Sequence, residues 1–302
     1  MLYSEPMIRH WPQLKLGNLR SRLMRTLWPQ SEVGSLITLP WEKRKPYRAG
    51  ILLGGDLYDT AESAALLASC DLLAVADSGA AHARLWQLEP DIAVGDFDSI
   101  AADDLLWLKE RKIPLYQFAE AKDEADSELA AYLLLSDRAG CEGKESVAAT
   151  DTTIELSLIA GELWTKSWLR NDLELLFLGC TGSRPDHLLA NLGLARVLTE
   201  RGIPVLLSDG ISLLVPLFGR DRVRILWPEK PIPEQKWLFS SIALSDLVTG
   251  ITYQSAQFPV ENYSLPRGTS LGLSNRGLSP HQVDFSLELE SGSLMVIVTG
   301  VD

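Results

Sequence analysis

The chain has few of the residues that build metal–thiolate sites, disulfide frameworks or membrane spans. Its 302 residues include only four histidines and three cysteines, and Cys70, Cys141 and Cys180 lie far apart without a C-x-x-C spacing. An odd number of scattered cysteines favours neither a zinc site nor a disulfide framework. No run of about 18 apolar residues and no apolar signal-peptide core is present. We therefore expect a protein of the reducing cytosol, without a transmembrane segment.

Positive charge is scarce as well. The chain has 28 Lys and Arg against 40 Asp and Glu, a net charge of −12, and this balance argues against a protein that binds nucleic acid by charge. Residues 1–48 are the exception, with a net charge of +6. We expect them to form a basic N-terminal extension with the pattern of an amphipathic helix. Such a helix docks on a membrane surface or a partner, or packs on the body of the protein, unless the extension is a loose tail.

From residue 49 onward, short apolar strands alternate with helical segments. We expect strands at 51–53, 72–76, 92–94, 113–118, 173–178 and 205–209, and helices at 62–70, 80–88, 129–135 and 188–196. This alternation predicts a parallel sheet covered by helices, an α/β domain over residues 49–209. Only short strand-like pieces follow, which predict a smaller all-β sandwich domain over residues 210–302.

Carboxylates follow two of these strands directly. Asp77 comes after the strand at 72–76, and Asp96 and Asp98 come after the strand at 92–94. In a parallel sheet the carboxyl ends of the strands share one edge, where ligands bind. Clustered carboxylates at such an edge suit a hard cation such as Mg²⁺, which in turn commonly accompanies phosphate.

Two further motifs open helices. Lys122, Asp123, Asp126 and Glu128 precede the helix at 129–135, and first-turn carboxylates also stabilise a helix dipole, although three beside a lysine exceed that need. The stretch 182–187 follows the strand at 173–178. Its arginine can clamp phosphate oxygens while its aspartate orients that arginine or the histidine. A plain turn with a helix N-cap is the alternative interpretation of this stretch.

Together these motifs resemble the thiamine pyrophosphokinase (thiamine diphosphokinase) family over nearly all of residues 49–299. The family's A-D-G-G, G-D-F-D-S, K-D-x-T-D-x-E, G-G-R-x-D-H and G-x-S-N stretches are matched in order by residues 76–79, 95–99, 122–128, 182–187 and 272–275. Ser78, Ala125 and Ser183 depart from the family pattern. Each changes one small group beside a phosphate-facing turn and so tunes binding there.

The resemblance implies a Rossmann-like catalytic domain followed by a thiamine-binding β domain. It also implies the reaction, in which the hydroxyethyl oxygen of thiamine attacks the β-phosphorus of ATP to give thiamine diphosphate and AMP. A homodimer is implied too, with each site between the catalytic domain of one subunit and the β domain of the other.

The residue roles are carried over from the resemblance. It implies that Mg²⁺ binds Asp96 and Asp98, helped by Asp123 or Asp126, and that Asp126 is the general base. It assigns catalysis to Asp96, Asp98, Asp126, Arg184 and Asp186. It assigns nucleotide binding to Asp77, Gly79, Ser99, Lys122, Arg184 and His187, and thiamine binding to Ser274 and Asn275. Of these, His187 either contacts phosphate or caps its own loop. From the residues alone, the Ser274–Asn275 pair is interpreted as a hairpin turn.

Three alternatives stay open. The chain is longer than the family between Glu128 and Arg184, and we favour a surface insertion at about 136–152 over a rearrangement in which Asp151 and Glu155 replace Asp126 and Glu128. The other two concern function. The chain is also compatible with an ATP-dependent pyrophosphokinase for another acceptor, such as a hydroxymethylpterin, or with a non-catalytic regulator that binds nucleotide or thiamine.

Overall fold

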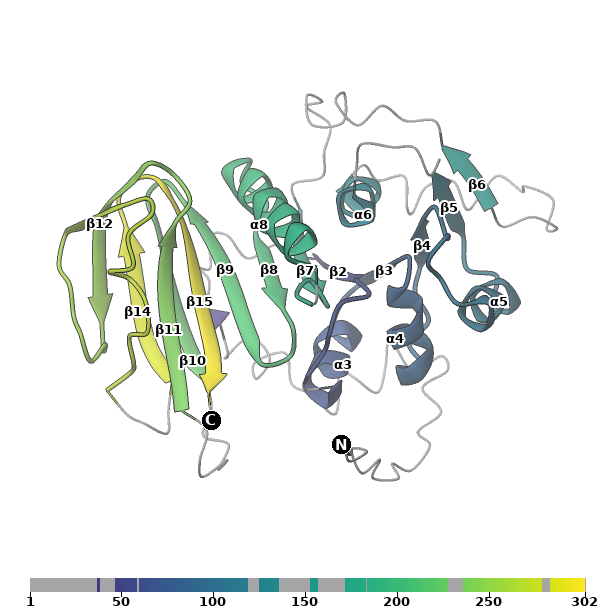
Figure 1. Cartoon of the computed structure of the whole chain (residues 1–302), viewed down its shortest axis with the longest axis horizontal. Helices are drawn as coiled ribbons and strands as arrows, with labels where there is room; N and C mark the ends of the chain where they lie inside the picture. The colour runs from purple at the N-terminus through teal and green to yellow at the C-terminus, as the bar shows by residue number, and fades with distance from the viewer. Residues whose placement is uncertain are drawn as a thin grey trace.

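The computed structural model describes residues 37–38, 47–58, 60–118, 125–135, 153–156, 172–182, 184–227, 236–278 and 283–301. These residues form two β-sheets with helices packed beside the larger one (Figure 1). None of the helices described is long and apolar enough to cross a membrane. The expected amphipathic helix and the expected insertion at 136–152 lie outside the described residues.

The larger sheet has ten strands in the order β11-β15-β9-β8-β7-β2-β3-β4-β5-β6. The strands from β8 to β6 in this order pair in parallel. They are β2 (Tyr47–Leu52), β3 (Leu72–Ala76), β4 (Ile92–Gly95), β5 (Leu115–Phe118), β6 (Thr153–Leu156), β7 (Leu173–Leu178) and β8 (Val205–Ser208). The parallel α/β arrangement predicted from the sequence is therefore confirmed.

Helices cover both faces of the parallel strands, which explains why those strands are apolar along their whole length. In Figure 1, α6 (Asp126–Leu135) and α8 (Pro185–Glu200) lie over one face, while α3 (Thr60–Ala68) and α4 (Gly79–Trp86) lie over the other. The short helix α5 (Ala102–Glu110) contacts α4. Ile51 and Leu52 are neighbours in β2 and both fully buried, but they belong to the hydrophobic cores of opposite faces.

The sheet continues into an antiparallel part after β8. The strands β9 (Ser212–Phe218), β15 (Ser293–Val301) and β11 (Lys236–Ala243) extend it. A second, antiparallel sheet has the order β1-β10-β14-β12-β13, formed by β1 (Ile37–Thr38), β10 (Asp221–Trp227), β14 (Val283–Leu289), β12 (Leu247–Gln254) and β13 (Tyr263–Pro266). Phe239 of β11 stacks on Phe285 of β14, with ring centroids 4.0 Å apart, so the two sheets share a core. This is the β-sandwich that the sequence predicted.

The change from parallel to antiparallel strands falls at the segment expected to divide the chain. The turn from 209 to 211 joins β8 to β9, but these two strands pair with each other, so the sheet runs on without a break. The sandwich sheet also includes part of the basic extension, because Ile37 of β1 pairs with Ile225 of β10. The division into separate domains near residue 209 stays a prediction.

Candidate active site

A cavity of about 360 Å³ opens at the carboxyl ends of the parallel strands. Its walls are the loops that follow β2, β3 and β7, together with the first residues of α6 and α8. The predicted site residues Asp77, Ser99, Asp126, Arg184 and His187 all line it. The sheet has therefore brought together residues that lie more than 100 positions apart in the sequence, at the edge where an α/β sheet binds its ligands.

Glycines allow the loops of this wall to touch through their backbones. A Cβ atom on Gly55 would lie 1.9 Å from the carbonyl oxygen of Thr181, and one on Gly79 would lie 2.1 Å from that of Leu52. Both distances are far shorter than any contact that a carbon atom tolerates. Ser78, which departs from the family pattern, occupies the space beside Gly54, since a Cβ there would meet the Ser78 hydroxyl. The close approach of Gly79 to the Leu52 carbonyl shows that Gly79 has a packing role at the start of α4.

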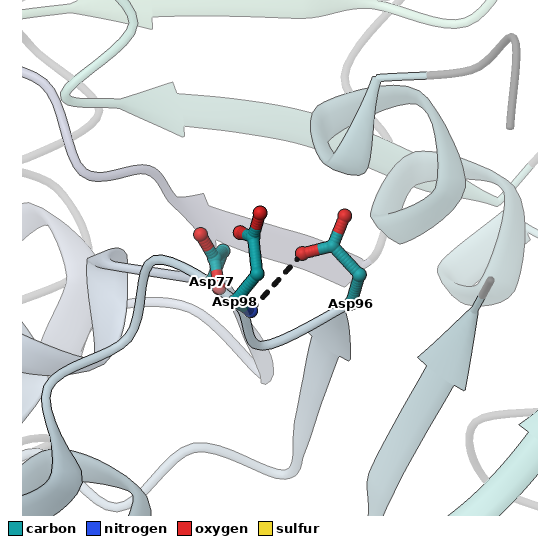
Figure 2. Close-up of side chains that lie close together, drawn as sticks. All are labelled: Asp77, Asp96 and Asp98. Carbon is teal, nitrogen blue, oxygen red and sulfur yellow. Dashed lines mark hydrogen bonds between the residues drawn. The ribbon is translucent and has the colours of Figure 1, made fainter. Parts of the chain in front are cut away.

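Three carboxylates gather beside the cavity, and of these Asp77 lines it while Asp96 and Asp98 do not. Asp77 follows β3, and Asp96 and Asp98 follow β4. Each contributes one carboxylate oxygen, and these three oxygens lie within 4.8 Å of one another. Figure 2 shows their side chains side by side, with the backbone N–H of Asp98 donating to Oδ1 of Asp96 at 3.2 Å. The predicted pair Asp96 and Asp98 is thus joined by Asp77, which had been expected to border the nucleotide.

Asp77 is the most buried member of this group, with 9% of its surface exposed. Ser99 donates its hydroxyl hydrogen to Oδ2 of Asp77, while Oδ1 is buried and accepts no hydrogen bond from the described residues. Burial raises the pKa of Asp77, and the charges of Asp126 and Asp96 raise it further against the opposing hydrogen bond from Ser99. A carboxylate with one oxygen free of hydrogen bonds, close to two other carboxylates, is a donor set that a hard divalent cation fits.

Asp126 lines the same cavity as Asp77. It is the first residue of α6 and lines the cavity near enough for its charge to act on Asp77, but it is not one of the three closely spaced carboxylates. The other two residues predicted from the same motif, Lys122 and Asp123, lie outside the described residues, as does Asp151. Glu155 lies in β6, the edge strand, where it pairs with Gln117 of β5.

The basic side of the cavity comes from the start of α8. Arg184 and Asp186 are both exposed and form a two-point ion pair, with Nη2 to Oδ2 at 2.6 Å and Nε to Oδ1 at 3.3 Å. This hydrogen bonding lowers the pKa of Asp186. Asp186 thus orients Arg184, as expected, and His187 lies exposed on the cavity wall one residue further along.

The two residues predicted to bind thiamine lie on a loop of the β-sandwich and do not line this cavity. Asn275 is 6% exposed, and both the oxygen and the nitrogen of its amide are hydrogen-bonded within the chain. Its Oδ1 accepts from the N–H groups of Phe258 and Arg276, and its Nδ2 donates to the carbonyl of Phe258 at 2.8 Å. Asn275 therefore holds two loops together. Ser274 beside it is exposed and has a positive φ of 58°.

The structure adds Asn191 to the residues that shape the cavity. It lies on α8, is 6% exposed, and its Nδ2 donates to the carbonyl oxygen of Cys180 at 3.1 Å. An asparagine on the buried face of a helix is the signal that could have identified it, because a buried amide needs a specific partner. Thr181 is a second addition, lining the cavity and donating to Oδ2 of Asp209 at 3.2 Å.

Comparison with known proteins identifies this arrangement. Residues 63–207 match the family described as thiamin pyrophosphokinase, catalytic domain, a span that contains both Asp77 and Arg184. The chain therefore carries the catalytic domain of the thiamin pyrophosphokinase family. It is therefore an enzyme of the pyrophosphotransferase type, as the sequence predicted.

Solved structures share the fold well beyond that span. A thiamine pyrophosphokinase from Bacillus subtilis superimposes with a TM-score of 0.59 at 19% identity, over 84% of this chain and 99% of its own. The enzyme from Candida albicans gives 0.66 at 16% identity, over 84% and 90%, and that from yeast gives 0.64 at 13%, over 89% and 93%. No curated protein matches the sequence. At these identities the structures confirm the two-part fold and nothing finer.

The environment of Asp77 leads to a stability prediction. An acid whose pKa is higher in the folded protein than in the unfolded chain destabilises the fold when it is ionised, from its unfolded pKa upward. At pH 7, Asp77→Asn therefore removes a destabilising charge, and the amide oxygen can still accept from Ser99. The melting temperature should therefore rise, by roughly 2–4 °C for each kcal/mol of relief.

The measurement is thermal unfolding at pH 7 in the presence of a chelator. The matched control is Asp103→Asn, the same change at an exposed position in the first turn of α5. Because Asp103 interacts favourably with the helix dipole, this variant should not have a raised melting temperature. Adding Mg²⁺ should then raise the melting temperature of the wild type more than that of Asp77→Asn. A lower melting temperature for Asp77→Asn in chelator would contradict this account of the site.

Proposed function

We propose that this protein transfers the pyrophosphoryl group of ATP to thiamine with the help of Mg²⁺ bound by Asp77, Asp96 and Asp98. The observation that supports it most is the group of three carboxylates next to a cavity that is lined by both Asp77 and Arg184. Such a site can hold a cation and a polyphosphate at once. The match to the family's catalytic domain supports the same reaction.

The metal site differs slightly from the one expected. We add Asp77 to Asp96 and Asp98, because one of its oxygens lies within the same 4.8 Å group and its Oδ1 accepts no hydrogen bond from the described residues. When bound there, Mg²⁺ would neutralise charge on the phosphate oxygens. Asp126 then remains for another task, close to the group but outside it.

We assign that task to proton transfer. The thiamine hydroxyl oxygen forms a bond to the β-phosphorus of ATP while the bond from that phosphorus to the α-phosphate oxygen breaks, so AMP leaves. The hydroxyl proton passes to the carboxylate of Asp126, a step worth about 100-fold or more in rate. Arg184, fixed by Asp186, binds phosphate oxygens in its fork geometry.

The ends of the helices complete the phosphate site. The cavity includes the first residues of α6 and α8 and the residues just before α4. Helix N-termini present unpaired N–H groups and a positive dipole end to an anion. This compensates in part for the net negative charge of the chain. His187, at the start of α8, stands where it can contact phosphate, and its role as a loop cap remains the alternative.

Thiamine is proposed to bind with the help of the β-sandwich of a second subunit. Leu271, Leu273 and Leu278 flank Ser274 and are exposed by 66%, 48% and 73%, and Phe258 nearby is exposed by 61%. Exposed apolar side chains gathered on one loop region are typical of a surface that a partner covers. We therefore infer a homodimer in which this loop, with Ser274, reaches the cavity of the partner subunit. A cytosolic location stays a prediction.

The dimer is tested by multi-angle light scattering of the purified protein. We expect the mass of two chains, and Leu278→Glu should shift the protein toward the mass of one chain, because a charge at an apolar contact is costly to bury. The mass of a single chain for the wild type would contradict the shared site.

The reaction is tested by AMP release from ATP and Mg²⁺, with and without thiamine, and by identifying the product as thiamine diphosphate. We expect AMP only when thiamine is present. Asp98→Asn should lower the rate by more than about 100-fold while the protein stays folded, since it removes a ligand of the metal. Asp103→Asn serves as the control with unchanged rate.

The assay also separates the alternatives. ATP binding without thiamine-dependent AMP, together with AMP release on addition of a hydroxymethylpterin, would favour a related pyrophosphokinase. Binding of nucleotide or thiamine without turnover for any acceptor would favour a regulator. Full activity of Asp98→Asn would contradict the metal assignment.

A further inference from the structure

His82 contacts the cavity wall from behind and is not among the residues expected in the site. It lies in α4, half-buried, with its ring stacked on Trp86 at a centroid distance of 5.7 Å. Its Nε2 lies 3.0 Å from the carbonyl oxygen of Gly55, in the loop after β2. Because a carbonyl oxygen can only accept, Nε2 carries the hydrogen of this bond. His82 therefore ties a cavity loop to a helix outside the cavity.

This bond fixes the orientation of one peptide plane. In a planar trans peptide the C=O and N–H groups point in opposite directions. With the Gly55 carbonyl directed at His82, the N–H of Asp56 is directed away from α4. Gly182 of the opposite loop lies beside this peptide, since a Cβ built on Gly182 would be 3.4 Å from the nitrogen of Asp56. Gly55 and Gly182 both line the cavity.

The loop after β7 is held in the same way. Asn191 of α8, which itself lines the cavity, donates to the carbonyl of Cys180. The two loops are also bonded to each other, because the N–H of Gly55 donates to the carbonyl of Gly179 at 3.0 Å. Each loop thus has one carbonyl fixed by a helix side chain, and a shift of the first loop disturbs the second. Glycine-rich loops need such restraint, since glycine has little conformational preference of its own.

We propose that His82 is a positioning residue of the nucleotide site, which holds the Gly54–Gly55 loop in the orientation that binds the phosphates of ATP. The inference rests on the proposed function in one respect, because that function names ATP as the ligand of the cavity. His82 itself does not line the cavity and acts only through Gly55.

A purely space-filling role of the ring predicts other results for two variants of His82 than the hydrogen-bonding role does. His82→Phe keeps an aromatic ring beside Trp86 but has no hydrogen to donate. His82→Gln loses the ring but places an Nε2–H group at a similar distance along the side chain. A positioning role through the hydrogen bond is impaired by Phe and rescued by Gln, while a packing role is preserved by Phe and impaired by Gln.

The experiment measures kcat and KM for ATP and for thiamine, together with equilibrium binding of MgATP and melting temperature. For His82→Phe we expect KM and the dissociation constant for MgATP to rise by about 3- to 10-fold, the worth of one neutral hydrogen bond. KM for thiamine should stay within twofold. His82→Gln should return both ATP constants to within about twofold of the wild type. Leu85→Ala, on the exposed face of the same helix, is the control.

Two results would overturn the proposal. One is wild-type ATP binding in His82→Phe, and the other is equal loss in the Phe and Gln variants with a lowered melting temperature in both. The binding measurement needs no turnover, so it reads the role of His82 separately from the reaction. A wild type that binds MgATP but forms no thiamine diphosphate would contradict the proposed function and leave the comparison of the two variants valid.

Discussion

The parallel pairing of β2, β3, β4 and β7 is the constraint on which the rest of the site depends. The register places Ala76 beside Val94 and Leu52 beside Leu178, so these strands end together at one edge. The N–H of Asp77 then donates to the carbonyl of Val94 at 2.9 Å, which fixes Asp77 beside the end of β4, the strand that Asp96 follows. A slip of one strand by a single residue would break up both the carboxylate group and the glycine contacts.

The close approach of the negatively charged carboxylates destabilises the folded protein when no cation is bound. Burial and the neighbouring carboxylates raise the pKa of Asp77 and oppose its ionisation. Such an arrangement is unfavourable in the empty protein and becomes favourable when a cation and a polyphosphate bind, which is how many active sites exchange stability for function. The buried core behind the site offsets this destabilisation. Leu52 and Leu178 are fully buried just behind the loops that form the cavity wall.

Much of the architecture could be predicted from the sequence because apolar runs and turn residues carry it. The strands at 72–76 and 173–178 were predicted with their observed bounds, and the helix that begins at Pro185 was expected three residues later. The carboxylate edge followed from the sheet itself. By contrast, α5 was not expected, because Asp103, Asp104 and Lys109 make it look like a polar loop although they suit the two ends of a helix. The roles of His82 and Asn191 could not be predicted, since each depends on a single contact across the fold.

Locating the bound metal tests the central claim most directly. Crystals grown with Mn²⁺ in place of Mg²⁺ and a non-hydrolysable ATP analogue would show the ion through its anomalous scattering. We predict one peak within about 2.0–2.4 Å of carboxylate oxygens from Asp77, Asp96 and Asp98, bridged to the phosphates of the analogue. An ion held elsewhere, or bound by phosphate without these three side chains, would contradict it.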